Sequence, residues 1–203
     1  MNSGKYIKPY TYTRVLDSTG QVILENTSST SQAISPAAAY ITADLLSGVV
    51  NSSVGTGKGA KLDCGISTYG KTGTTDENYD RWLCGFTPYY TAVTWYGYDQ
   101  NESIHFNKKN PAGLLWANVM SRIHTGLKTA KFEKPSAVSS VTICPETGKK
   151  ARTGCQNTYT EYFLWGTEPD ECTKHSGRRA TVINEEKETP STNVYRDDEK
   201  ELE

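Results

Sequence analysis

The fold is decided by residues 69–98, which read YGKTGTTDENYDRWLCGFTPYYTAVTWYGY. Three runs in this stretch are rich in β-branched and aromatic residues, and short turn-forming segments separate them. The pattern predicts strands over residues 67–75, 81–87 and 91–98. Because the connections are short, we expect the three strands to be antiparallel.

Two helices flank this predicted sheet in the sequence. Ser35-Pro36 and Asn110-Pro111 each supply a capping side chain followed by a first-turn proline, and the first pair predicts a helix over residues 36–50. The expected apolar faces are Ile41, Leu45, Leu46 and Val49 in the first helix, and Leu115, Trp116, Val119, Met120 and Ile123 in the second. An antiparallel sheet covered by helices makes the chain an α+β protein.

The rest of the chain divides around this central part. Residues 6–24 predict a β-hairpin, and the Ser/Thr-rich residues 26–32 predict a linker. A small region with one strand at residues 137–143 and three late cysteines follows the second helix. The predicted divisions are residues 1–128, a cysteine-bearing extension over 129–175, and an acidic tail over 176–203 that we expect to be disordered.

Composition excludes several classes of function. The chain of 203 residues carries a net charge of −1 and lacks the clustered Lys and Arg of a nucleic-acid-binding protein. It has no apolar run of the roughly 20 residues that cross a membrane, and no signal peptide follows Met1. We therefore expect any export signal or anchor to lie outside this chain.

Two glycine-rich stretches resemble nucleotide-binding motifs. Gly55-x-Gly57-x-x-Ala60 matches the loose dinucleotide fingerprint, and residues 65–72 match the pattern G-x-x-x-x-G-K-[ST]. Both motifs need a helix N-terminus after the loop to hold the phosphates. Neither stretch leads into a predicted helix, so we expect no nucleotide and no other cofactor.

The segment from Lys71 to Thr75 is better read as an edge strand that binds a ligand. The absence of a side chain at Gly73 lets a peptide backbone lie against the strand. The hydroxyls of Thr72 and Thr74 suit a carboxylate, and Lys71 adds positive potential. The alternative from the residues alone is an exposed hairpin that happens to carry a lysine and threonines.

The sequence resembles the transpeptidase domain of penicillin-binding proteins, particularly those with an added glycosyltransferase domain. The matching motifs are Gly70-Lys71-Thr72-Gly73-Thr74-Thr75, Asp80-x-Trp82-x-x-Gly85-Phe86-Thr87-Pro88, Gly97-Tyr98-Asp99, Asn2-x-Gly4-x-Tyr6-Ile7-x-Pro9 and Gly55-Thr56-Gly57-x-x-Ala60. The cysteine-bearing end, with Gly166-Thr167-Glu168-Pro169 before Cys172, is similar to extensions found in clostridial members. The motifs together cover most of residues 2–175.

The resemblance implies acyl transfer on the D-Ala-D-Ala end of peptidoglycan stem peptides, with β-lactams trapping the same serine. The family's motifs are S-x-x-K, S-x-N and K-T-G. It implies a catalytic role for Lys71 and for the backbone amide of Thr74 as an oxyanion donor. Substrate binding would fall to Thr72, Gly73, Thr74 and Thr75. The parent protein is expected at the extracytoplasmic face of the cell membrane.

The nucleophile motif is missing. No serine is followed by a lysine three residues later, and the one S-x-N, Ser191-Thr192-Asn193, follows Lys71 instead of preceding it and is attributed to chance. The chain is therefore expected to be the C-terminal part of a transpeptidase domain, to need the upstream part of that domain as partner, and to be inactive alone. The alternatives are a non-catalytic peptide- or protein-binding module that uses the Lys71–Thr75 edge, and a β-lactamase or carboxypeptidase, which the C-terminal extension disfavours.

The late cysteines allow two arrangements. Cys144, Cys155, Cys172 and His175 offer four zinc ligands at plausible spacing. The extracytoplasmic location that the resemblance implies favours a disulfide between two of the cysteines, so the expectation is a disulfide and no metal. Cys84, between Leu83 and Gly85 in a predicted strand, is expected to be a buried apolar residue.

Overall fold

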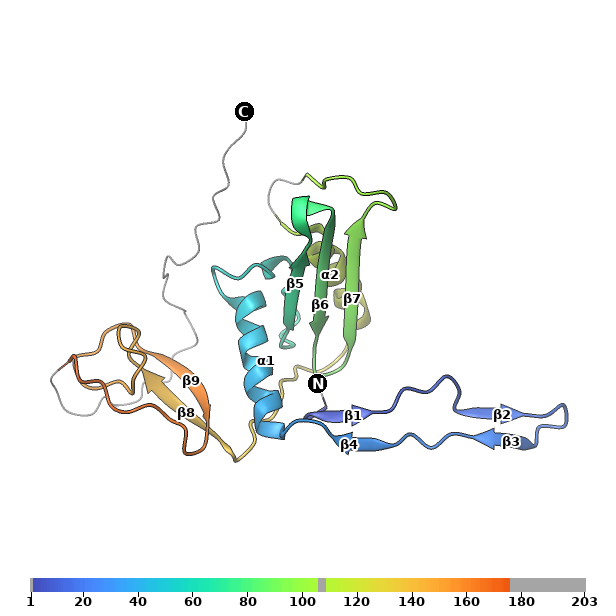
Figure 1. Ribbon diagram of the computed structural model, residues 1–203, viewed down its shortest axis with the longest axis horizontal. Coiled ribbons are helices and arrows are strands. Elements are labelled where there is room, and N and C mark those ends of the chain that lie inside the picture. The colour runs from blue at the N-terminus through green and yellow to red at the C-terminus, as the bar shows by residue number, and fades with distance from the viewer. Residues whose placement is uncertain (1, 106–108, 176–203) are drawn as a thin grey trace.

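The computed structural model describes residues 2–105 and 109–175 (Figure 1). Its centre is a three-stranded antiparallel sheet in the order β5-β6-β7. The strands are β5 (Tyr69–Thr74), β6 (Asp80–Phe86) and β7 (Thr91–Gly97). The three predicted strands and their pairing are confirmed, with ends that differ by two residues or fewer.

Both predicted helices are present and begin where the sequence placed them. Helix α1 (Pro36–Asn51) lies along β5, and helix α2 (Pro111–Ile123) covers one face of the sheet (Figure 1). The Ser35 hydroxyl accepts a hydrogen bond from the third helical amide at 3.1 Å, and the Asn110 side chain accepts one from the second at 3.0 Å. These caps satisfy amides that the helices leave without partners, and the α+β class is confirmed.

The core lies between α2 and the sheet. Trp116 and Leu83 are both fully buried there, and the Trp116 indole donates to the Ala92 carbonyl at 3.0 Å. A Cβ added at Gly85 would lie 2.8 Å from the Trp116 ring, so this glycine allows the indole to rest directly on β6. The members of this core cluster are Val50, Ala60, Leu62, Leu83, Ala112, Trp116 and Met120.

The apolar helix faces that the sequence predicts are buried only in part. In α2, Trp116 and Met120 are buried as expected, but Leu115, Val119 and Ile123 are exposed. In α1 the sheet side is lined by alanines, and Leu45 on the predicted face is 65% exposed. Small residues let a helix approach the sheet closely, so the larger apolar side chains fall on faces that the described residues do not cover.

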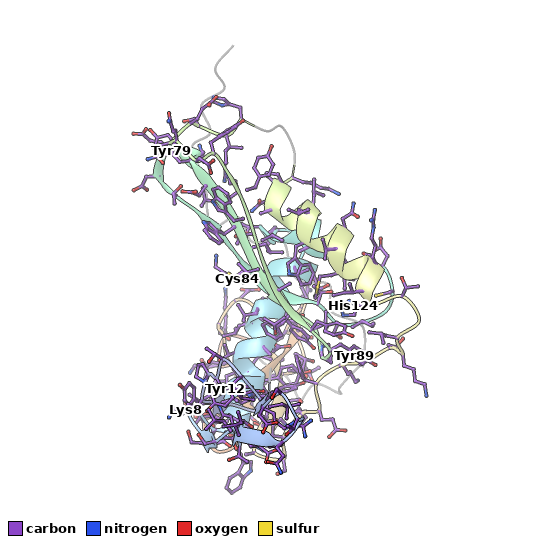
Figure 2. All side chains as sticks on the ribbon, turned by 90° about the vertical axis from the view of Figure 1, so that its right-hand side faces the viewer. Lys8, Tyr12, Tyr79, Cys84, Tyr89 and His124 are labelled. Carbon is purple, nitrogen blue, oxygen red and sulfur yellow. The ribbon has the colours of Figure 1, made fainter. Side chains whose placement is uncertain are left out.

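One face of the sheet is likewise open. Because side chains alternate along a strand, Leu83 points toward α2 while Trp82 and Cys84 point to the other side. Trp82 pairs with Trp95 across β6 and β7, and Cys84 pairs with Val93. All four side chains are exposed, and Figure 2 shows Cys84 on the sheet apart from α2. The expectation that Cys84 is buried was therefore wrong.

The N-terminal residues form a long antiparallel arm that extends away from the sheet (Figure 1). The predicted hairpin is present as β2 (Arg14–Leu16) and β3 (Val22–Glu25). The predicted linker was wrong in part, because β4 (Thr30–Gln32) pairs with β1 (Lys5–Ile7). Every residue of these four strands is exposed, so backbone pairing here leaves no hydrophobic pattern in the sequence.

A two-stranded unit follows the sheet and its helices. It pairs β8 (Val138–Ile143), which the sequence predicted, with β9 (Tyr159–Leu164), which it did not. The Tyr162 ring meets Tyr40 of α1 edge-on, with ring centroids 5.4 Å apart. The predicted disordered tail, residues 176–203, and its Ser191-Thr192-Asn193 lie outside the described residues. Among the residues described, neither helix has the length and apolar character to span a bilayer.

Candidate active site wall on strand β5

The predicted ligand-binding residues lie on the outermost strand of the sheet. Lys71 to Thr74 belong to β5, and Thr75 caps the short 3₁₀ helix η2 (Asp76–Asn78) that follows it. Within the described part of the chain, β5 pairs with β6 only, so its other edge presents backbone groups that no strand uses. Lys71 and Thr74 are exposed, and Thr72 and Gly73 are half-buried.

The hydroxyls of Thr72 and Thr74 are each held by a neighbour. Thr72 Oγ1 lies 2.9 Å from Thr56 Oγ1, and Thr74 Oγ1 accepts a hydrogen bond from Nη1 of Arg81 at 2.9 Å. Arg81 stands opposite Thr74 on β6 and also donates to Asn78 Oδ1 at 2.6 Å. Because Arg81 is a donor only, the Thr74 hydroxyl keeps its own proton for an incoming acceptor.

Thr56 reaches Thr72 because of the glycine loop after α1. The Gly57 amide donates to the Val49 carbonyl at 2.9 Å, which folds the loop back on the last helical turn. A Cβ added at Gly55 would lie 2.2 Å from that same carbonyl, so a side chain is not tolerated there. The loop leads into a three-residue 3₁₀ helix, η1 (Lys58–Ala60), so it offers no helix dipole to a dinucleotide. Likewise, Gly70, Lys71 and Thr72 lie within β5, so no helix begins directly after the second stretch.

Lys71 and Gly73 occupy the other face of β5. The Lys71 ammonium donates to the Thr72 carbonyl at 3.0 Å, so the positive charge rests against the strand's own backbone. A Cβ added at Gly73 would lie 3.1 Å from the Cβ of Trp82, its partner on β6. The glycine therefore leaves room for Trp82.

Asp80 joins the ends of the three strands beside this site. Its carboxylate accepts from the Thr75 hydroxyl at 3.0 Å and from the Trp95 indole at 2.7 Å, and its amide donates to the same Thr75 oxygen at 2.8 Å. The two bonds between Asp80 and Thr75 hold the turn that follows the last residue of β5, Thr74. The sequence showed Asp80 only as part of a motif, and it did not show Arg81 or Thr56 as neighbours of the threonines. Strand register would have placed Arg81 opposite Thr74.

A second group of reactive side chains lies in the β8–β9 unit. All five cysteines fall within the described residues and all are free thiols. The sulfurs of Cys144, Cys155 and Cys172 and a ring nitrogen of His175 lie within 4.8 Å of one another. The Thr147 hydroxyl and the amides of residues 174 and 175 lower the pKa of the Cys172 thiol to about 5, which favours its thiolate.

The comparisons with known proteins match both parts of the chain. The family model described as the penicillin binding protein transpeptidase domain matches residues 1–120. The model described as the C-terminal domain of penicillin-binding protein 1A matches residues 134–177. These two matched ranges contain the β5 site and the cysteine group respectively.

Curated relatives are also named as penicillin-binding proteins. Penicillin-binding protein 1A of Clostridium tetani (strain Massachusetts / E88) is 38% identical over 184 residues, which are 87% of this chain and 23% of that protein. Penicillin-binding protein 2D of Bacillus subtilis (strain 168) is 34% identical over 174 residues, which are 83% of this chain and 25% of that protein. The chain thus spans about a quarter of the length of these relatives.

A solved structure shows the same fold. The crystal structure of penicillin-binding protein 1A from Haemophilus influenzae superposes with a TM-score of 0.66 at 21% sequence identity. The match covers 83% of this chain and 30% of that one. Together with the family models, this likeness confirms the resemblance drawn from the sequence motifs. The chain belongs to the penicillin-binding protein transpeptidase family.

Proposed function

We propose that β5 forms the substrate-binding wall of a serine D,D-transpeptidase site. A stem peptide ending in D-Ala-D-Ala would lie along the open edge of the strand, as an added strand does. Its terminal carboxylate would accept hydrogen bonds from the hydroxyls of Thr72 and Thr74, with Lys71 and Arg81 supplying positive charge. The observation that carries this proposal is the edge strand itself, on which both hydroxyls are fixed by neighbours beside two cations.

The reaction would be acyl transfer. A serine attacks the penultimate carbonyl, the terminal D-Ala leaves, and an amine from a neighbouring strand resolves the acyl-enzyme. The amide of Thr74 would serve as one oxyanion donor, because it lies on the strand next to the carboxylate-binding hydroxyls. A β-lactam would acylate the same serine.

The nucleophile would come from another segment of the protein. The sequence contains no S-x-x-K, so the serine and its lysine would lie in the upstream part of the same transpeptidase domain. This chain would then be inactive alone. The domain would work at the extracytoplasmic face of the membrane, where peptidoglycan is assembled. The exposed large apolar side chains on α1, α2 and the open sheet face would contact that upstream part.

The test uses a protein in which this chain is joined to the upstream S-x-x-K segment. Replacing Thr72 and Thr74 together by valine removes both hydroxyls at nearly constant volume. A hydrogen bond to a charged group contributes about 1.5–3 kcal/mol, so acylation by a fluorescent penicillin should slow at least about 100-fold. Thr91→Val, on the far strand β7, is the matched control and should leave the rate unchanged.

An unchanged rate in the double variant would overturn the proposal. The second candidate function, a non-catalytic module that binds a peptide or protein at the Lys71–Thr75 edge, makes a different prediction. In that case the joined protein would show no penicillin labelling, while the isolated chain would still bind a peptide with a free carboxylate.

A further inference from the structure

The Cys/His group in the β8–β9 unit is built by three separate turns that backbone hydrogen bonds hold together. Cys144 directly follows β8, Cys155 lies in the loop before β9, and Cys172 follows β9. The Cys144 amide donates to the carbonyl of residue 149 at 2.8 Å, and the Cys172 amide donates to the carbonyl of Lys150 at 2.8 Å. The same short segment therefore fixes two of the three cysteines.

The ring nitrogen of His175 has three sulfur neighbours at nearly equal distances. Nδ1 lies 3.6 Å from the sulfur of Cys144, 3.4 Å from that of Cys155 and 3.4 Å from that of Cys172. An imidazole nitrogen carries either one hydrogen or one lone pair, so it makes at most one hydrogen bond. Hydrogen bonding thus accounts for one of the three contacts and leaves two unexplained.

A tetrahedral metal accounts for all three contacts. With zinc–sulfur bonds of about 2.3 Å and a zinc–nitrogen bond of about 2.05 Å, tetrahedral angles place the sulfur and nitrogen about 3.5 Å apart. The observed separations of 3.4 to 3.6 Å match that value. A disulfide would join two sulfurs at about 2.05 Å and would leave the third thiol and the imidazole without a role. We propose that Cys144, Cys155, Cys172 and His175 bind one structural Zn²⁺ ion.

The surroundings suit such an ion. The second ring nitrogen of His175 lies 3.4 Å from a Glu146 carboxylate oxygen, which would fix the ring with Nδ1 toward the metal. The Arg152 amide donates to the Cys155 sulfur at 3.3 Å, as amides do at thiolate ligands. Cys144 and Cys172 are fully buried. Four protein ligands and this burial leave no open position for water, so the site is structural and not catalytic.

A metal ion would also stabilise the β8–β9 unit, which has a small apolar core. Beside the two buried cysteines, the cluster at these turns contains only Ala151 as a buried residue, with half-buried Cys155 packed against it; Val138 and Ile143 of β8 are buried outside that cluster among the described residues. A two-stranded hairpin is marginally stable by itself in water. The free energy of zinc binding at a structural site contributes directly to the free energy of folding. One ion would therefore stabilise turns that have little apolar packing between them.

The test begins with the unaltered 203-residue chain, purified without chelators. We expect about one zinc per chain by elemental analysis, as for a closed four-ligand site. In native protein, the exposed Cys64 and Cys84 should react rapidly with a thiol reagent, and the other three cysteines only after a strong chelator is added. After unfolding without reductant, all five cysteines should be free thiols.

Substitutions of the proposed ligands provide a second test. Cys172→Ser and His175→Ala should lower the zinc content at least about 10-fold, whereas Cys64→Ser, outside the unit, should retain it. Three free thiols in the unfolded chain would show a disulfide and overturn the proposal. Zinc that stays bound in both ligand variants, or iron in place of zinc, would overturn it as well. The thiol count in unaltered protein keeps the test valid if a variant fails to fold.

Discussion

Arg81 offers the sharpest test of the site, because no sequence motif selects it as a site residue. Arg81→Met removes the guanidinium and keeps an apolar stem. A carboxylate bound to the Thr74 hydroxyl would lie one hydrogen bond beyond Oγ1, which is itself 2.9 Å from Nη1. The two charges would thus be about 5 Å apart, which at an effective dielectric constant between about 40 and 80 is about 1–2 kcal/mol. We therefore expect acylation to slow roughly 5- to 30-fold.

The assay is the second-order rate of acylation by a fluorescent penicillin in the joined protein. Because the effect is electrostatic at an exposed site, the loss should shrink as salt is raised. Arg122→Met, on the exposed end of α2, is the matched control and should leave the rate and its salt dependence unchanged. Equal melting temperatures would exclude unfolding as the cause. An Arg81→Met rate within a factor of about two of wild type at low salt would show that Arg81 does not act on the bound carboxylate.

Three further predictions concern the stability of the chain, measured by urea unfolding. Trp116→Ala should cost about 3–5 kcal/mol because its ring is fully buried, whereas Trp165→Ala, at 80% exposure, should cost less than about 0.5 kcal/mol; equal costs would contradict the described core. Gly73→Ala should cost about 1–3 kcal/mol, because the new Cβ meets the facing tryptophan at 3.1 Å, and no loss would show that the strand yields there. The Ser139 hydroxyl holds the pKa of the Glu168 carboxyl below its usual value in the folded protein. The ionised carboxylate therefore stabilises the fold at pH values above the pKa of the unfolded chain, and this stabilisation is lost as the pH falls through the lower pKa of the folded protein. Glu168→Gln should therefore be less stable than wild type at pH 7 and equally stable in acid; a difference that persisted in acid would show another cause.

The central sheet could be predicted from the sequence because it is packed on one face. β-Branched and aromatic runs separated by turn-forming segments mark its strands, and the pairs Ser35-Pro36 and Asn110-Pro111 mark the starts of both helices. The exposed arm has no such pattern, so its sequence predicts a linker where β4 lies. The predicted apolar faces of the helices were wrong in part for a related reason. Leu45 and Leu115 follow helical periodicity, yet they point away from the described core.

The candidate site was predicted by residue type but not by geometry. Lys71 to Thr75 stand out because small hydroxyl side chains follow a lysine within a strand. Thr56 and Arg81 do not stand out, because their roles depend on a folded-back loop and on cross-strand register. The grouping of His175 with three cysteines likewise requires three turns to converge, which spacing alone does not show.

Intact-protein mass spectrometry after treatment with penicillin tests whether the nucleophile lies in a segment of the protein other than the one that carries β5. We predict that the isolated 203-residue chain gains no covalent adduct. The joined protein should gain one penicilloyl group, mapped to a serine upstream of this chain. A stable adduct on any serine of this chain would contradict the account.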